Sequence, residues 1–177
     1  SAQAIAKKFA LALGTLAWHM TSQTPIAQGH ATECDAFLER ALALRSGGDH
    51  AGAISLFKQR PGPCENDPRL EAELAMTEAW EGEYASSLAR YEALLMRPLP
   101  DHQRKGVRHA YGRVLAWSGK WQKALTHYER MLAEDPHDRE ALRGRAFVFR
   151  AQGRHRSARE AYKHILDRWP DDEEALS

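Results

Sequence analysis

The stretch that decides the fold is YGRVLAWSGKWQKALTHYERMLAEDP, residues 111–136, which returns in altered form as RAFVFRAQGRHRSAREAYKHILDRWP, residues 145–170. The two stretches agree at only a few positions, each 34 residues apart, among them Gly119 and Gly153, Ala124 and Ala158, Tyr128 and Tyr162, and Pro136 and Pro170. A fixed period of this length, kept at small, aromatic and proline residues, indicates a stacked structural repeat.

The same markers occur twice more, earlier in the chain. The marker glycines are separated by 34, 37 and 34 residues, and the extra three residues fall near Pro98 and Pro100, which predict a loop. A small residue lies five positions after each glycine, and an aromatic residue lies four positions further on. In chain order the markers are Gly48, Ala53, Phe57; Gly82, Ser87, Tyr91; Gly119, Ala124, Tyr128; and Gly153, Ala158, Tyr162.

Each repeat is predicted to form two helices joined by a tight turn. In residues 105–138 the apolar positions recur at three- and four-residue spacing before and after Gly119, as on one face of a helix. Gly119 permits a turn that other residues disfavour, and Ala124 lets the two helices approach closely. We expect Tyr128 to fill the wedge between this pair and its neighbour. The face residues are Val107, Tyr111, Val114, Leu115, Trp121, Leu125, Tyr128 and Leu132.

This pattern, over residues 34–172, resembles the tetratricopeptide repeat, a helix–turn–helix unit of the same period. The resemblance implies an all-α, right-handed superhelical solenoid of about four units within residues 32–177. The units are expected at 34–67, 68–104, 105–138 and 139–172, and 173–177 reads as the start of a truncated fifth unit, because DDEEALS mirrors HDREALR. The first unit departs most, since it lacks a terminal Asp-Pro. Arg40 and Arg145 stand where the family has large apolar residues.

Residues 1–31 differ in composition from the repeats. Two lysines, the apolar run FALALGTLAW and a small polar stretch follow one another as in a secretory signal, with cleavage expected after Gly29 or Ala31. The apolar run is too short to span a bilayer, so no transmembrane span is predicted. This interpretation predicts export to the periplasm. In the alternative, residues 1–31 form an N-terminal capping helix, and the protein is then cytoplasmic.

Cys34 and Cys64 are the two cysteines of the chain. Cys34 opens the first helix of the first unit, and Cys64 follows the second helix. Because antiparallel helices bring those two ends together, a disulfide is geometrically reasonable. It would staple a terminal unit that has a single neighbour and would agree with export, whereas the alternative is two unpaired thiols.

Charge and motifs limit the classes of function. The net charge is +1, with 7 basic and 12 acidic residues in 31–100 but 16 basic and 12 acidic residues in 101–177. This balance argues against nucleic-acid binding through bulk charge. The sequence has no glycine-rich phosphate loop, H-E-x-x-H, C-x-x-C or G-x-S-x-G motif, so it predicts no catalytic residue, metal or cofactor. A non-catalytic scaffold is the expected class.

In tetratricopeptide arrays the first helices line a concave groove in which protein or peptide partners usually bind. Aromatic rings beside arginines suit an extended acidic peptide, and a sugar chain could stack on the indoles instead. In the alternative, Trp80 and Trp117 do not face a ligand and instead pack against the next first helix. Asn66 is the only asparagine, which argues against a clamp for a terminal carboxylate. The register implies groove positions at Leu38, Leu42, Arg45; Met76, Ala79, Trp80; His109, Arg113, Trp117; and Arg143, Phe147, Arg150.

A short pattern, A-W-x-G-x-[YW], occurs at residues 79–84 and 116–121. Together with the signal-like start, it resembles the periplasmic repeat arms of outer-membrane barrel proteins, some of which serve in exopolysaccharide export. The resemblance implies a role in export or envelope assembly. The alternatives are a free-standing adaptor that assembles a multiprotein complex and a carbohydrate-binding repeat module.

Overall fold

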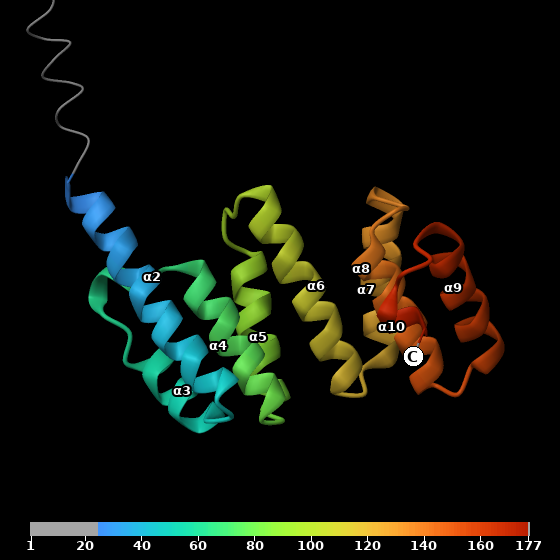
Figure 1. The fold of residues 1–177 in the computed structure, drawn as a ribbon, viewed down its shortest axis with the longest axis horizontal. Helices are drawn as coiled ribbons and strands as arrows, with labels where there is room; N and C mark the ends of the chain where they lie inside the picture. The colour runs from blue at the N-terminus through green and yellow to red at the C-terminus, as the bar shows by residue number, and fades with distance from the viewer. Residues whose placement is uncertain (1–24, 177) are drawn as a thin grey trace, which may run out of the picture.

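The computed structural model describes residues 25–176, and within this range it contains helices and no strand. The expected all-α solenoid is confirmed, because the four helix pairs follow one another in sequence order along the long axis of the molecule (Figure 1). The first helices of the four pairs are α2 (Pro25–Ser46), α4 (Pro68–Trp80), α6 (Asp101–Trp117) and α8 (Arg139–Ala151). The second helices are α3 (His50–Lys58), α5 (Tyr84–Leu95), α7 (Trp121–Glu134) and α9 (His155–Arg168).

Two short helices complete the described chain. The 3-10 helix η1 (Gly62–Cys64) lies between α3 and α4, and α10 (Glu173–Leu176) follows α9. Residues 1–24 lie outside the described residues, so most of the expected signal segment is not described. The backbone of α2 includes both expected cleavage positions, Gly29 and Ala31. None of the helices described here is both long and apolar enough to cross a membrane.

The four marker glycines make the turn inside each helix pair. Their φ angles are +85° at Gly48, +81° at Gly82, +73° at Gly119 and +71° at Gly153. This left-handed region strains any residue that carries a Cβ atom, which explains why glycine recurs there while the surrounding residues change.

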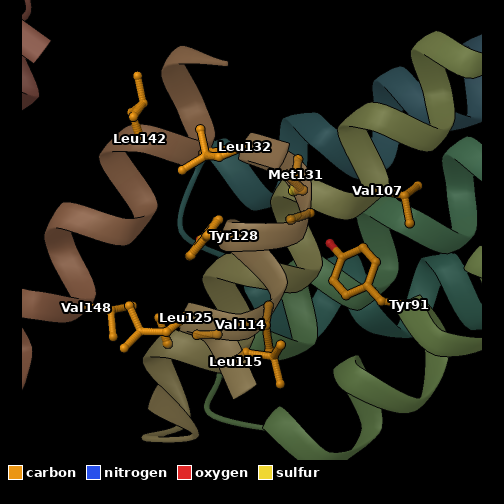
Figure 2. Packing of buried hydrophobic residues seen from close by; sticks show 14 of the residues in the cluster. Tyr91, Val107, Val114, Leu115, Leu125, Tyr128, Met131, Leu132, Leu142 and Val148 are labelled. Atoms are coloured by element: carbon orange, nitrogen blue, oxygen red, sulfur yellow. The ribbon is translucent and has the colours of Figure 1, made fainter. Parts of the chain in front are cut away.

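The recurring small and aromatic residues lie where helices pack against each other. Ala53, Ser87 and Ala124 are fully buried. Tyr128 of α7 lies between α6 and α8, because a Cβ atom added at Gly112 would meet its ring at 2.7 Å and one added at Gly144 would overlap the ring. Figure 2 shows Tyr128 among the buried side chains of α6, α7 and α8. As expected, Tyr128 fills the wedge between its own helix pair and the next one.

Two details of the helices differ from the expectation. α6 has 17 residues where α4 and α8 have 13, so most of the extra residues lengthen α6 instead of the loop before it. α6 therefore begins at Asp101, before the expected unit boundary at residue 105. Trp121 was expected on the buried face of α7, but its side chain is 38% exposed, because it occupies the first position of the helix.

A disulfide joins Cys34 of α2 to Cys64 of η1, with the Cα atoms 5.5 Å apart. Both cysteines are buried in a small core that is separate from the main one and also contains Phe37, Phe57 and Leu70. Since Leu70 belongs to α4, this helix connects the first pair to the rest of the array.

Buried charges also fix α4 against its neighbours. The fully buried Glu78 accepts a hydrogen bond from Arg90 Nε of α5 at 2.8 Å. Glu71 accepts from Arg90 Nη1 at 2.7 Å and from Arg60 Nη2 at 2.8 Å. Because a buried carboxylate is costly without such partners, this network fixes α4 against α5 and against Arg60, which follows α3.

Candidate functional site

Two adjoining pockets lie along the first helices, and we call them together the groove. The α4–α6 pocket has a volume of about 440 Å³ and the α6–α8 pocket about 330 Å³. Arg113 and Trp117 of α6 line both pockets, so the groove is continuous across α6. The α4–α6 pocket also contains Arg45, Pro68, Arg69, Ala72, Glu73, Met76, Trp80, Tyr91, Gln103, Gly106, Val107 and Ala110. The α6–α8 pocket also contains His109, Ala116, Tyr128, Glu140, Arg143, Gly144, Phe147, Arg150 and Tyr162.

The nine residues predicted as the partner-binding set are all among these lining residues: Arg45, Met76, Trp80, His109, Arg113, Trp117, Arg143, Phe147 and Arg150. Three further register positions do not line the groove. Ala79 is buried at 2% exposure, because it faces the core where Trp80 faces outward. Leu38 and Leu42 are half-buried, and Leu38 packs against the small core around the disulfide.

The repeated A-W-x-G pattern places an indole in the groove at the end of a first helix. Ala79 and Ala116 are buried, and the glycines two residues after each tryptophan make the turn. The tryptophans between them project outward, with Trp80 47% and Trp117 37% exposed. Both indoles are therefore groove residues and not core residues.

Neighbouring side chains hold the Trp80 indole in place. The guanidinium carbon of Arg45 lies 4.8 Å from the ring centroid, and the His50 ring lies 5.7 Å from it. Arg45 is itself bound to the Glu73 carboxylate, and His50 Nδ1 lies 2.7 Å from Glu81 Oε1. An indole supported in this way loses little freedom when a ligand packs on it.

Two basic side chains of the groove, His109 and Arg143, connect one helix pair to the next. Asp138, the N-cap of α8, lies 2.9 Å from His109 Nε2 with each of its carboxylate oxygens. The buried Asp172 accepts a hydrogen bond from Arg143 Nε at 2.8 Å. His109 and Arg143 are 34 residues apart and hold equivalent positions, so the same contact is made twice. Both side chains are therefore already engaged within the chain.

Hydrogen bonds lower the pKa of both aspartates. Burial by itself would raise the pKa of Asp138, but hydrogen bonds from His109 and from the Ala141 N–H outweigh it. The pKa of Asp172 is lowered in the same way, since hydrogen bonds from Arg143 and Arg139 outweigh its burial. At pH values above 3.8, the ordinary pKa of an aspartate, each carboxylate therefore stabilises the folded state. This stabilisation is lost as the pH falls through the lowered pKa of the folded protein.

We expect the free energy of unfolding to fall as the pH drops below about 5 and through the lowered pKa values of Asp138 and Asp172. Asp172→Asn should lower stability at neutral pH and make this fall shallower, because the titrating group is gone. Asp171→Asn is the matched control, since Asp171 is exposed. Urea unfolding at several pH values measures the slopes, and equal slopes for Asp172→Asn and the unaltered chain would contradict the expectation.

Arg113 and Arg150 differ from the other groove cations. Both are exposed, and neither forms an ion pair or a hydrogen bond with the residues described in 25–176. The guanidinium carbon of Arg150 lies 5.7 Å from the centroid of the Phe147 ring and 5.8 Å from that of Tyr162. The groove thus combines aromatic area with two guanidinium groups that have no carboxylate partner in the described part of the chain.

The packing just described, with left-handed glycine turns at a period near 34 residues, agrees with the comparison of the sequence with known families. Residues 109–173 match the family model of the tetratricopeptide repeat. Residues 109–173 carry tetratricopeptide repeats. Among curated proteins, no sequence matches this chain. Within residues 25–176 no group of three or more His, Cys, Asp or Glu side chains could hold a metal ion.

Solved structures of tetratricopeptide repeat proteins share the fold of this chain. A putative kinesin light chain of Podosopora anserina with nearly identical repeats is 18% identical, with a TM-score of 0.64 over 85% of this chain and 80% of that chain. YrrB, described as having an unusual peptide-binding site, is 16% identical, with a TM-score of 0.62 over 81% and 72%. A protein from Parabacteroides merdae is 20% identical, with a TM-score of 0.61 over 81% of this chain, which spans 56% of that protein's length.

Some residues that line the groove were not predicted to do so from the sequence. Tyr162 and Tyr128 were expected as packing residues, yet both also line the α6–α8 pocket. Their position at the junction of two pairs explains this double role. The engagement of His109 and Arg143 by Asp138 and Asp172 also went unforeseen, although an aspartate 29 residues after each of them was a usable signal.

Proposed function

We propose that this tetratricopeptide array is a non-catalytic scaffold whose groove binds an extended segment of a partner protein. The observation that carries the proposal is the pair of exposed tryptophans, Trp80 and Trp117, at equivalent positions of one continuous groove. Exposed aromatic side chains in a pocket are the residues that most often dominate protein binding energy. The peptide-binding site named for YrrB lends support by analogy of fold alone.

The proposal is tested with a displayed library of random peptides, each about 12 residues long, selected on the full chain. For the best selected peptide, Trp117→Ala and Trp80→Ala should each weaken binding by about tenfold or more, because each removes a ring that would pack on the ligand. Circular dichroism should show unchanged helicity, since both indoles lie outside the core.

Trp121→Ala is the matched control, because Trp121 is as exposed as Trp117 but lines neither pocket. It should leave the affinity unchanged. Loss of helicity in Trp117→Ala, or an equal loss of binding in Trp121→Ala, would refute the assignment of the groove.

We also propose that the scaffold works in an oxidising compartment such as the bacterial periplasm, and the disulfide supports this placement. This location is consistent with a role in exopolysaccharide export or envelope assembly. It is also consistent with an adaptor that assembles a multiprotein complex. A carbohydrate ligand is the second candidate, because indole rings also stack on sugars. Oligosaccharides titrated against tryptophan fluorescence beside the selected peptide separate the two ligand classes.

A further inference from the structure

We propose that the groove selects acidic segments, with an apolar or aromatic side chain of the ligand in the α4–α6 pocket and its carboxylates on Arg113 and Arg150. The inference rests on the proposed function and specifies the chemistry of its ligand. It follows from which cations of the groove already have partners and which do not.

Apart from Arg113, which lines both pockets, the α4–α6 pocket contains two arginines, Arg45 and Arg69, and both already have carboxylate partners. Arg45 is bound to Glu73, which lines the same pocket. Arg69 contacts Asp67 at 2.7 Å and Asp35 at 2.6 Å. Both cations are therefore neutralised within the chain, and a carboxylate of a ligand would have to compete with an existing one.

The same pocket offers apolar surface instead. Met76, Trp80 and Val107 line it, with the half-exposed Trp80 ring held by Arg45. An aromatic or branched aliphatic side chain fits such a surface, because its burial removes apolar area from water without leaving a polar group unpaired.

The α6–α8 pocket has an excess of positive charge. His109 and Arg143 are engaged by Asp138 and Asp172, as described above. Among the described residues that line the pocket, Glu140 is the one acidic residue, and it accepts a hydrogen bond from Arg143 Nη1 at 2.7 Å. This leaves the guanidinium groups of Arg113 and Arg150, which no carboxylate of the described chain neutralises.

The side chains around Arg150 restrict its position and leave its N–H donors available to an anion. Its guanidinium group lies near the Phe147 and Tyr162 rings, which restrict the side chain without using its N–H donors. An arginine with free donors binds a carboxylate through two parallel hydrogen bonds. Arg113 belongs to both pockets, so an acidic residue bound there would lie next to the side chain held in the α4–α6 pocket.

The sequences of the selected library peptides test this inference. Peptides enriched on the unaltered chain should contain more Asp and Glu than the starting library, together with an aromatic or large aliphatic residue. Selection on the Arg113→Gln, Arg150→Gln double variant should remove the acidic enrichment and keep the apolar one, because the α4–α6 pocket keeps its apolar lining.

The affinity of one synthesised acidic peptide gives the size of the effect. Arg113→Gln and Arg150→Gln should each weaken binding about tenfold, as expected for the loss of a charge-assisted hydrogen bond. Replacing the acidic residues of the peptide by their amides should weaken it at least as much. Arg159→Gln is the matched control, since this exposed arginine of α9 lines neither pocket, and it should leave the affinity unchanged.

The outcomes distinguish this inference from the proposed function. If enriched peptides are neutral or basic but still require Trp117, the groove stands and the preference for acidic ligands is overturned. If heparin binds as well as the peptide and Arg159→Gln weakens both, the attraction is unspecific and the inference also fails. If no enriched peptide depends on Trp117, the proposed function itself is refuted.

Discussion

Gly144→Ala is expected to lower the free energy of unfolding by about 1–3 kcal/mol, the usual cost of forcing extra volume into a packed site. In an ordinary helix the same change stabilises by about 0.5–1 kcal/mol, so the expected sign is reversed. The reason is that a Cβ atom on Gly144 would overlap the Tyr128 ring, which fills the junction between α6, α7 and α8. Urea unfolding measures the difference.

A double-mutant cycle identifies the cause. Tyr128→Ala alone should cost about 3–5 kcal/mol, because it removes a buried ring and leaves a cavity. In the Tyr128→Ala background, Gly144→Ala should become stabilising, since the clash is gone. Gly106→Ala is the control, because Gly106 lies in α6 and a Cβ atom added there would meet no atom within 4 Å, so it should stabilise in both backgrounds. Destabilisation by Gly144→Ala in both backgrounds would show that Tyr128 is not the wedge.

Removing the disulfide is also expected to lower the free energy of unfolding strongly. Replacing Cys34 and Cys64 by serine opens a loop closed across 30 residues, and such crosslinks typically contribute about 2–4 kcal/mol. The loss should concentrate in α2 and α3, because the core around the disulfide is separate from the main core. Hydrogen exchange should accelerate in these two helices and remain slow in α6–α9.

The reduced unaltered chain is the control for the serine variant. Reduction with a thiol should reproduce the faster exchange of α2 and α3, and reoxidation should reverse it. If neither treatment changes the exchange or the unfolding midpoint, the crosslink contributes nothing to the first pair. In that case the support that it gives to an oxidising compartment would also disappear.

The residues that the sequence predicted well are those whose role is set within one unit. A glycine that must adopt a left-handed φ, such as Gly119, and a small residue between two helices, such as Ala124, have a local cause that recurs at every repeat. Trp80 and Trp117 could be placed in the groove by register for the same reason. The period therefore predicted the helix pairs, and the resemblance to the tetratricopeptide repeat implied most of the candidate site.

The features that the sequence left open arise between units. Whether Arg143 is available to a ligand depends on Asp172, which reaches back from the start of α10. Gly112 and Gly144 are not at equivalent repeat positions, yet both make room for Tyr128, and only the packing reveals it. Ala79 and Trp80 are adjacent in sequence, and small differences in helix rotation decide which one faces the groove.

The most direct test of the groove is photo-crosslinking of a selected peptide that carries benzoylphenylalanine in place of its aromatic residue. Mass spectrometry of the crosslinked complex identifies the residues touched. We expect crosslinks to groove residues of α4, α6 and α8, such as Met76, Val107 and Trp117. Crosslinks confined to the exposed faces of α5, α7 and α9 would contradict it.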